Sequence, residues 1–374
     1  MRVVICAIAA LSVAACATTP VPNMRPLNEA QIAAIGPTRV VIAESDHGVA
    51  KSWFMQDSSA AGASYGLIGA LVTATMDAIM NAAPSRRARR AADEIAEVMP
   101  VAELNTSLTE QFRGQIVATT PPPPGIVVSE VSTVRKLSTP GVIDDAVEVA
   151  TSYVLSEDAS TLRIVAAVTY QNAAVPYATP YTFEGSVPKA ETMGPVYRNV
   201  FTYYSQQLPV PTLTPELQAR LVESIQDSAR DDAGVLPVEG TDAFKAMNKE
   251  LEQARDGEFT KGEIAIFLAR EWAKDDGALL KAELDSAEAF ITRYVLLDMN
   301  QTAVPSFQGE TALVETLADG RTIRRVGAGL DAGSYISSPA NVSSFATYGN
   351  AVGIARIHED RLRVLRQQPR TRAE

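Results

Sequence analysis

A serine between two glycines is the residue in this sequence whose surroundings best fit a chemical role. Residues 62–66, GASYG, match the G-x-S-x-G pattern that holds the nucleophile of many hydrolases. Such a serine follows a buried strand, begins a helix, and needs an acid and a histidine later in the chain. Ser64 has His358 downstream, but residues 52–61 end in polar and small side chains where the strand should run. A serine hydrolase using Ser64 and His358 is therefore one hypothesis, although the expected strand before Ser64 is not evident in the sequence.

The same glycines also begin a row of small residues at intervals of four, which is the spacing of one ridge of a helix. The row consists of Gly62, Gly66, Ala70, Ala74, Ala78 and Ala82. No side chain on this ridge is larger than a methyl group, so another backbone can approach it closely. Because packing explains more residues than the hydrolase pattern does, we expect a helix over 60–83 that is buried in a soluble domain. An oligomer contact and membrane insertion are the alternatives, and Asp77 opposes insertion because a charge is costly at mid-bilayer depth.

A basic cluster follows directly in residues 84–94, PSRRARRAADE. Its four arginines are Arg86, Arg87, Arg89 and Arg90. They are candidates for contacts with lipid head groups, because basic side chains are attracted to an anionic membrane surface. The alternative, which we favour, is a solvated helix face on which Arg89 and Arg90 lie near Asp93 and Glu94.

The sequence contains no pattern that predicts a metal or cofactor site. Its two histidines, His47 and His358, are far apart and have no ligand spacing to each other. No acidic run fits a calcium loop. Residues 327–332, GAGLDA, match a glycine pattern of dinucleotide sites, but the residues after them do not predict a helix that could hold a pyrophosphate. We therefore expect no metal, no cofactor and no catalytic residue.

The first fifteen residues have the features of a secretory signal. Arg2 precedes an apolar run that is too short to span a bilayer, and small residues follow it. Residues 13–16, VAAC, resemble the lipobox of bacterial lipoproteins. This resemblance implies cleavage before Cys16, lipidation of that cysteine and acylation of the new N-terminus. Ala17, in place of an aspartate, implies the outer membrane, with the chain facing the periplasm.

The charge of the chain limits its partners. It has 33 basic and 44 acidic side chains, and loss of Arg2 with the leader leaves a formal net charge of −12. This acidity argues against a nucleic-acid partner. Cys6 also leaves with the leader, so we expect neither a disulfide nor a thiolate metal site. The expected partners are the membrane, through lipidated Cys16, and an envelope protein or a second copy of the chain.

Hydrophobic patterning predicts an α+β fold in four parts after the leader. These are a lipid tether at 16–37, a small α+β domain at 38–190, a helical region at 191–300 and an antiparallel β region at 301–374. The elements expected in the α+β domain are a strand at 38–44, helices at 60–83, 85–99 and after Pro100, a strand from 125, and a hairpin of strands 147–155 and 162–170. Helical character is expected from about Val196 onward.

Capping residues and one long apolar pattern define the later elements. Thr214, Thr241 and Thr260 are expected to begin helices. After Gly277, a helix-bundle seam is formed by Leu280, Leu284, Ala287, Ile291, Tyr294 and Asp298. Asp319-Gly320 predicts a β-hairpin. The remaining expectations are strands at 313–317, 322–326, 353–357 and 362–365, with loops over 327–350.

The order of elements between residues 38 and 170 resembles two small α+β domains. One is found in envelope lipoproteins that activate cell-wall synthases, and the other is the N-terminal domain of TolB. The whole chain more nearly resembles uncharacterised bacterial lipoproteins, a resemblance that implies no activity. We expect a non-catalytic envelope lipoprotein that acts as a periplasmic binding, scaffold or accessory subunit. The alternatives are the serine hydrolase and a protein that inserts into membranes or self-assembles through residues 60–83.

Overall fold

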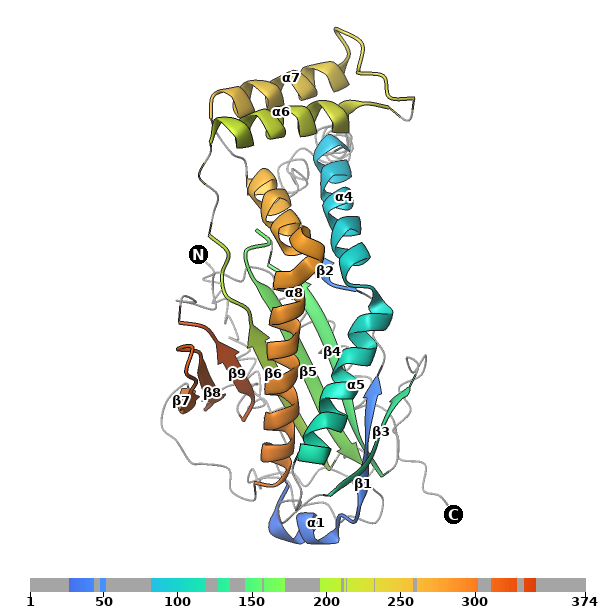
Figure 1. The fold of residues 1–374 in the computed structure, drawn as a ribbon, viewed down its shortest axis with the longest axis vertical. Helices are drawn as coiled ribbons and strands as arrows, with labels where there is room; N and C mark the ends of the chain where they lie inside the picture. The colour runs from blue at the N-terminus through green and yellow to red at the C-terminus, as the bar shows by residue number, and fades with distance from the viewer. Residues whose placement is uncertain are drawn as a thin grey trace, which may run out of the picture.

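The fold is seen in a computed structural model that describes much of the chain between Leu27 and Ala340. The described residues are 27–43, 48–51, 82–118, 127–134, 145–156, 158–171, 196–209, 212, 214–231, 233–257, 261–301, 311–327 and 333–340. Figure 1 shows an elongated molecule with a sheet in one part and a pair of helices at the far end.

Nine strands in the described part of the chain form one mixed sheet, which confirms the predicted α+β class. Their bounds are β1 Thr38–Ala43, β2 Ala50–Lys51, β3 Val128–Val134, β4 Ala146–Leu155, β5 Leu162–Gln171, β6 Tyr197–Tyr204, β7 Thr311–Thr316, β8 Thr322–Val326 and β9 Tyr335–Ser338. Eight of them follow the order β3-β1-β4-β5-β6-β9-β8-β7, and β2 pairs with β4.

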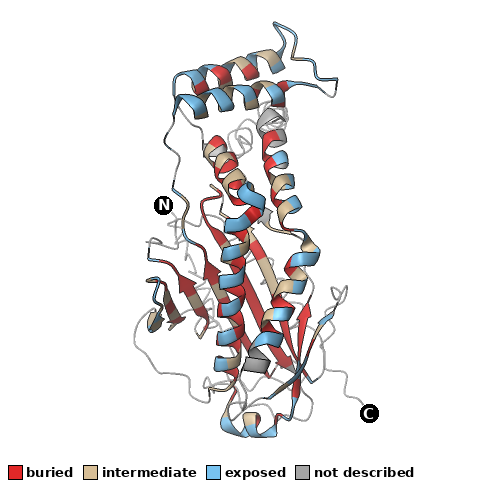
Figure 2. Ribbon diagram, in the orientation of Figure 1, coloured by how far each residue is buried: buried red, intermediate tan, exposed pale blue. Residues whose placement is uncertain are grey.

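The predicted hairpin of β4 and β5 is confirmed and lies inside the sheet. Val149 lies opposite Val168 and Leu155 opposite Leu162, so the alternating apolar residues of both strands share a face. The predicted first strand, β1, lies parallel between β3 and β4. Figure 2 shows that these inner strands are largely buried.

Two long helices, α5 and α8, cover one face of the sheet (Figure 1). The helix bounds are α1 Glu29–Ala34, α4 Ala82–Val98, α5 Val101–Ala118, α6 Pro215–Ala229, α7 Asp242–Arg255 and α8 Lys261–Met299. On α5, Leu104, Leu108 and Phe112 are buried, as their spacing of four predicts. The predicted seam on α8 is confirmed as well, since all six of its residues from Leu280 to Asp298 are buried.

Helices α6 and α7 form a hairpin at the end of the molecule away from the sheet (Figure 1). Both begin where the sequence predicts, because the side chains of Thr214 and Thr241 accept hydrogen bonds from backbone N–H groups of the first turn. The hairpin has a small apolar core of its own, consisting of Ile225, Ala229, Met247, Leu251 and Ala254. It packs on the body through α4.

Helix α8 is interrupted just before its seam. Lys274 is extended, and Asp275, Asp276 and Gly277 adopt left-handed conformations with φ of 53°, 58° and 69°. A left-handed conformation is unfavourable for residues with a Cβ atom. The break separates a first segment, 261–273, which reaches toward the α6–α7 hairpin, from a second segment, 278–299, which packs on the sheet (Figure 1).

Several expectations about individual elements are corrected. Residues 197–204, expected to be helical, form β6, and residues 335–338, expected in a loop, form β9 between β6 and β8. The tether is shorter than predicted, because Leu27 and Ile35 are buried in the core around α1. Helix α4 does not begin after Pro84 but includes it in the first described turn, where proline is tolerated.

The three folded regions expected from the sequence share one sheet and one hydrophobic core. Val149, Trp272 and Tyr335, one from each region, belong to the same core cluster. The boundaries at 190 and 300 therefore do not divide separately packed bodies.

Some expectations lie outside the described residues. These are residues 60–81 of the helix expected at 60–83, and the strand pair at 353–357 and 362–365. None of the helices within the described ranges is long and apolar enough to cross a membrane.

Candidate functional site

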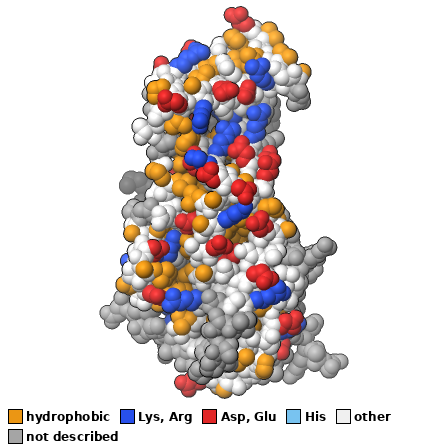
Figure 3. Space-filling view, viewed as in Figure 1, with side chains coloured by type: hydrophobic (Ala, Val, Ile, Leu, Met, Phe, Trp, Pro, Cys, Tyr) orange, Lys and Arg blue, Asp and Glu red, His pale blue; other side chains and the backbone are white. Residues whose placement is uncertain are grey.

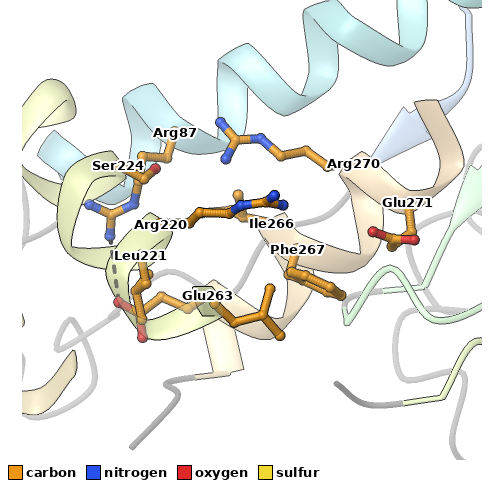
Figure 4. Close-up of a pocket in the computed structure, with 10 residues that line it drawn as sticks. Arg87, Arg220, Leu221, Ser224, Glu263, Ile266, Phe267, Arg270 and Glu271 are labelled. Atoms are coloured by element: carbon orange, nitrogen blue, oxygen red, sulfur yellow. Dashed lines mark ion pairs between the residues drawn. The ribbon is translucent and has the colours of Figure 1, made fainter. Parts of the chain in front are cut away.

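A pocket opens between the α6–α7 hairpin and helices α4 and α8 (Figure 4). Its volume is about 170 Å³, and a cavity of roughly 150 Å³ in a protein core can hold a benzene molecule. It is lined by Arg87 of α4, by Leu217, Arg220, Leu221 and Ser224 of α6, and by Glu263, Ile266, Phe267, Arg270 and Glu271 of α8. We call it the hairpin pocket.

Helical spacing brings the lining residues of each helix onto one side. On α6, Leu217 and Leu221 are four positions apart and therefore lie one turn above the other. On α8, the positions of Glu263, Phe267 and Arg270 recur at intervals of four and three. Each helix thus contributes both apolar and charged side chains to the same wall.

Arg87 is the most deeply buried cation of the hairpin pocket, with an exposed fraction of 2%. Its Nη2 donates a hydrogen bond of 2.7 Å to Oε2 of Glu250 on α7, which ties the hairpin to α4. Its Nε and Nη1 have no hydrogen-bond partner among the described residues. Leaving a buried donor without a partner costs about 1–3 kcal/mol. Arg87 therefore brings to the pocket wall two buried donors that no described residue satisfies.

Arg220 and Arg270 extend into the same space from opposite sides (Figure 4). Nε of Arg270 lies 3.4 Å from Oε1 of Glu94 on α4, in an orientation that does not make a hydrogen bond. Arg220 is exposed and forms no ion pair within the described part of the chain. Figure 3 shows basic, acidic and apolar side chains gathered at this end of the molecule. Three guanidinium groups thus border one hollow.

Carboxylates balance much of this positive charge. Glu263 is buried, with Oε1 4.0 Å from Nη2 of Arg87, and Glu271 also lines the pocket. Glu271 is in turn 3.6 Å from the ammonium group of Lys274. The pocket wall therefore presents N–H donors with carboxylates beside them, and it is not a strongly basic patch.

The remaining wall is apolar and is formed by Leu217, Leu221, Ile266 and Phe267. Sites for small ligands typically combine an apolar wall with a few placed polar groups. A guanidinium group donates in a planar fork that matches the oxygens of a carboxylate or a phosphate. The hairpin pocket can therefore hold a ligand that has both an apolar group and an oxyanion.

A second group of buried charges joins β6, β8 and the end of α8. Asp298 accepts hydrogen bonds from Tyr197 Oη at 2.8 Å and from Asn199 Nδ2 at 2.6 Å, and Arg325 Nη2 lies 3.1 Å from its other oxygen. Nε of Arg325 donates to the carbonyl oxygen of Gly333 at 3.2 Å. Burial, reinforced by the charge of Asp298, raises the pKa of Tyr197, so its hydroxyl stays protonated as a donor. We call Tyr197, Asn199, Asp298 and Arg325 the C-terminal cluster.

Glu288 of α8 is a buried acid between α8 and α5. Its exposed fraction is 0%, it accepts a hydrogen bond from the hydroxyl of Ser107, and its Oε1 has no partner among the described residues. Burial raises the pKa of Glu288 to about 7, against the effect of the Ser107 hydrogen bond and with a contribution from Asp285. Glu288 therefore keeps its proton at pH values where an exposed glutamate has lost it.

The structure corrects the prediction for one of the four arginines that were expected to contact lipid head groups. Arg87 is buried and bonded to Glu250, so it offers no surface to a lipid. Arg90 is exposed. The side chains of Arg86 and Arg89 lie outside the described residues.

The other predicted site residues are not brought together by the described part of the chain. Those outside it are Cys16, Ser64, His358, Gly62, Gly66, Ala70, Ala74 and Ala78. Ala82 is the first residue of α4, and its side chain is not among those described. The hydrolase and the packing ridge thus stay predictions. Within the described ranges, no group of three or more His, Cys, Asp or Glu residues is placed to hold a metal ion.

Sequence reasoning missed Arg220 and Arg270, and with them the pocket. Arg220 had no local signal, since it is an exposed arginine of an amphipathic helix whose buried side is formed by Ile225 and Ala229. The convergence of residues 87, 220 and 270 has no local signal, because it depends on packing between segments that are far apart in the sequence.

Comparisons with known proteins place this α+β chain in no known family. No protein-family model, no curated protein and no solved structure matches it.

Proposed function

We propose that this chain is a non-catalytic lipoprotein of the bacterial outer membrane that acts in the periplasm as a binding, scaffold or accessory subunit. The lipobox resemblance of residues 13–16 supports an anchor at Cys16. The observation that carries the binding role is the hairpin pocket, which combines an apolar wall with the N–H donors of Arg87 that have no partner among the described residues.

The position of the pocket supports this role. The described chain enters the fold at α1, whereas the α6–α7 hairpin stands at the other end of the molecule (Figure 1). A lipid anchor ahead of α1 would therefore hold the hairpin pocket away from the membrane surface. A ligand or partner in the periplasm could reach it there.

The anchor is tested by labelling cells with radioactive palmitate and separating their membranes. We expect the wild-type protein to carry the label and to sediment with the outer membrane. The Cys16→Ser variant should lose the label and appear in the soluble periplasm, because a lipid chain is what holds the protein at the bilayer. A labelled Cys16→Ser variant, or one that still sediments with membranes, contradicts the lipoprotein proposal.

The partner is tested by crosslinking the lipidated protein in living cells and purifying it in detergent. Recovery of one envelope protein in near-stoichiometric amount supports an accessory or scaffold role. Recovery of crosslinked copies of this chain alone supports self-association. Recovery of the uncrosslinked monomer alone, together with hydrolysis of ester substrates that Ser64→Ala abolishes, overturns the non-catalytic proposal in favour of a hydrolase.

A further inference from the structure

The polar atoms of the hairpin pocket favour an anionic ligand. Nε and Nη1 of Arg87 are buried donors with no partner among the described residues, and the Arg87 side chain lines the hollow. Arg220 and Arg270 bring two more guanidinium groups to the same space (Figure 4). A carboxylate oxygen placed there would accept from donors that the fold leaves unused.

The acids around the pocket limit how much negative charge the ligand can have. Glu263 and Glu271 line the hollow, and Glu250 is already bonded to Arg87. Each additional negative charge on a ligand is repelled by these carboxylates at short range. A singly charged group is therefore favoured over a phosphate dianion.

The volume and the apolar wall define the rest of the ligand. A hollow of about 170 Å³ has room for one small ring or a short branched chain. Leu217, Leu221 and Phe267 supply the surface against which such a group would be buried.

We propose that the hairpin pocket binds a small organic monocarboxylate, with its carboxylate at Arg87, Arg220 and Arg270 and its apolar group against Leu217, Leu221 and Phe267. This inference deepens the proposed binding function and rests on it. Because α6 supplies one wall and α4 and α8 supply the other, the ligand also joins the hairpin to the body.

The test uses the full lipidated chain in a neutral detergent and measures binding by titration calorimetry. The probes are benzoate, its neutral isostere benzamide, acetate, and inorganic phosphate. We expect one benzoate per chain, and binding of each of the other three probes at least about tenfold weaker, because benzamide lacks the charge, acetate lacks the ring, and phosphate carries excess charge.

Variants distinguish the pocket from adventitious binding. Arg220→Gln and Arg270→Gln should each weaken benzoate binding by about tenfold, because each removes a charged donor. Arg87→Gln should weaken it further, and its folding is checked by the unfolding midpoint. Arg230→Gln is the matched control, since Arg230 is exposed at the C-cap of α6, is paired with Asp227, and does not line the pocket. Its affinity for benzoate should equal that of the wild type.

A second measurement reports where the ligand sits. Hydrogen exchange of the backbone amides of α6 should slow when benzoate is added, because the ligand joins α6 to α8, while exchange in β4 and β5 should not change. Arg220→Gln should show less protection at the same benzoate concentration.

Three outcomes overturn the inference. They are equal binding of benzoate and benzamide, phosphate binding tighter than benzoate, and benzoate binding that Arg220→Gln and Arg270→Gln leave unchanged. These results are independent of the crosslinking experiment. A chain that captures an envelope partner but binds no benzoate refutes the monocarboxylate alone, whereas a chain that shows neither refutes the binding function as well.

Discussion

The hairpin pocket and the C-terminal cluster each contain a buried arginine, but the fold uses these two side chains differently. Arg325 donates through Nε to Gly333 and pairs through Nη2 with Asp298, and its guanidinium carbon lies 5.1 Å from the ring centroid of Tyr335. Arg87 is bonded through Nη2 alone, and its other two guanidinium nitrogens have no partner among the described residues. Nη1 of Arg325 also lacks such a partner, but Arg325 does not line the pocket.

The difference separates a structural ion pair from a site with free binding capacity. Removing one partner of a buried pair is strongly destabilising, so a cluster of closely bonded groups such as that around Asp298 is suited to hold elements together. Unused donors beside a hollow can instead be satisfied by a ligand. Arg87 combines both properties, since one nitrogen holds Glu250 of the hairpin, two have no partner among the described residues, and the side chain lines the pocket.

The largest expected effect tests the two arginines directly. We expect Arg325→Met to lower the free energy of unfolding by about 3–5 kcal/mol, because it leaves the buried charge of Asp298 uncompensated. Arg87→Met should cost less, about 1–3 kcal/mol, because it removes two unpartnered donors along with one charged hydrogen bond, although it also takes the nearby cation from buried Glu263. The Glu250 side chain is also 16% exposed and can be hydrated. Urea unfolding of the mature chain measures both losses.

The matched control for these variants is Arg230→Met, in which the exposed arginine at the C-cap of α6 is replaced. It should change the free energy of unfolding by less than about 0.5 kcal/mol. Equal losses for Arg87→Met and Arg325→Met would show that the two arginines have the same structural role.

The next effect compares two buried acids of α8. Asp298 is paired with Arg325, whereas Glu288 has the hydroxyl of Ser107 as its partner among the described residues. Burial raises the pKa of Glu288 to about 7 in the folded chain, from the ordinary value of 4.5 that it has when unfolded. Between these values the folded state binds more protons, so stability falls as pH rises from about 4.5 to 7, by about 3 kcal/mol in all. Glu288→Gln should remove this decline, because an amide does not titrate.

Unfolding midpoints measured at pH 4.5, 6 and 8 check this prediction. The Gln variant should gain stability relative to the wild type with rising pH, and the gain should stop increasing above pH 7. Glu252→Gln on α7 is the control, since Glu252 is exposed and its replacement should leave the pH dependence unchanged. A wild type and a Glu288→Gln variant with parallel pH profiles would refute the raised pKa of Glu288.

Elements with local signals were predictable from the sequence. Thr214 and Thr241 carry the side chains that cap α6 and α7, and the β4–β5 hairpin has strict alternation on both strands. The seam of α8 was predictable for the same reason, because one helix face contains its whole apolar pattern. In each case the deciding contacts lie within one element or between neighbouring elements.

Elements that depend on distant partners were not predictable. Strand β9 has only four residues and exists because β6 and β8 pair with it from either side. Strand β6 contains the aromatic residues typical of strands, but its polar Asn199 is buried because Asp298 and the carbonyl oxygen of Gly333, both distant in sequence, accept its hydrogen bonds. The pocket was not predictable for the same reason. Arg87 belongs to a basic cluster that the sequence shows, but Glu250, which accepts its hydrogen bond, is 163 positions away.

The smallest effect concerns the break in α8, which separates the segment that lines the pocket from the segment that carries Asp298. Gly277 has a φ of +69°, and a Cβ atom built there would lie 2.8 Å from Cγ2 of Val98 on α4. We expect Gly277→Ala to cost about 1–2 kcal/mol for the left-handed backbone, with a further loss from the Val98 contact.

Urea unfolding of Gly277→Ala, Val98→Ala and the double variant measures the two contributions. If the contact matters, the double variant should lose less than the sum of the single losses, because Val98→Ala removes Cγ2, the nearer of the two Val98 atoms that the new Cβ would meet, and leaves Cβ at 3.0 Å. Strict additivity would leave the left-handed conformation as the reason for glycine, and no loss at all would show that the break in α8 does not depend on Gly277.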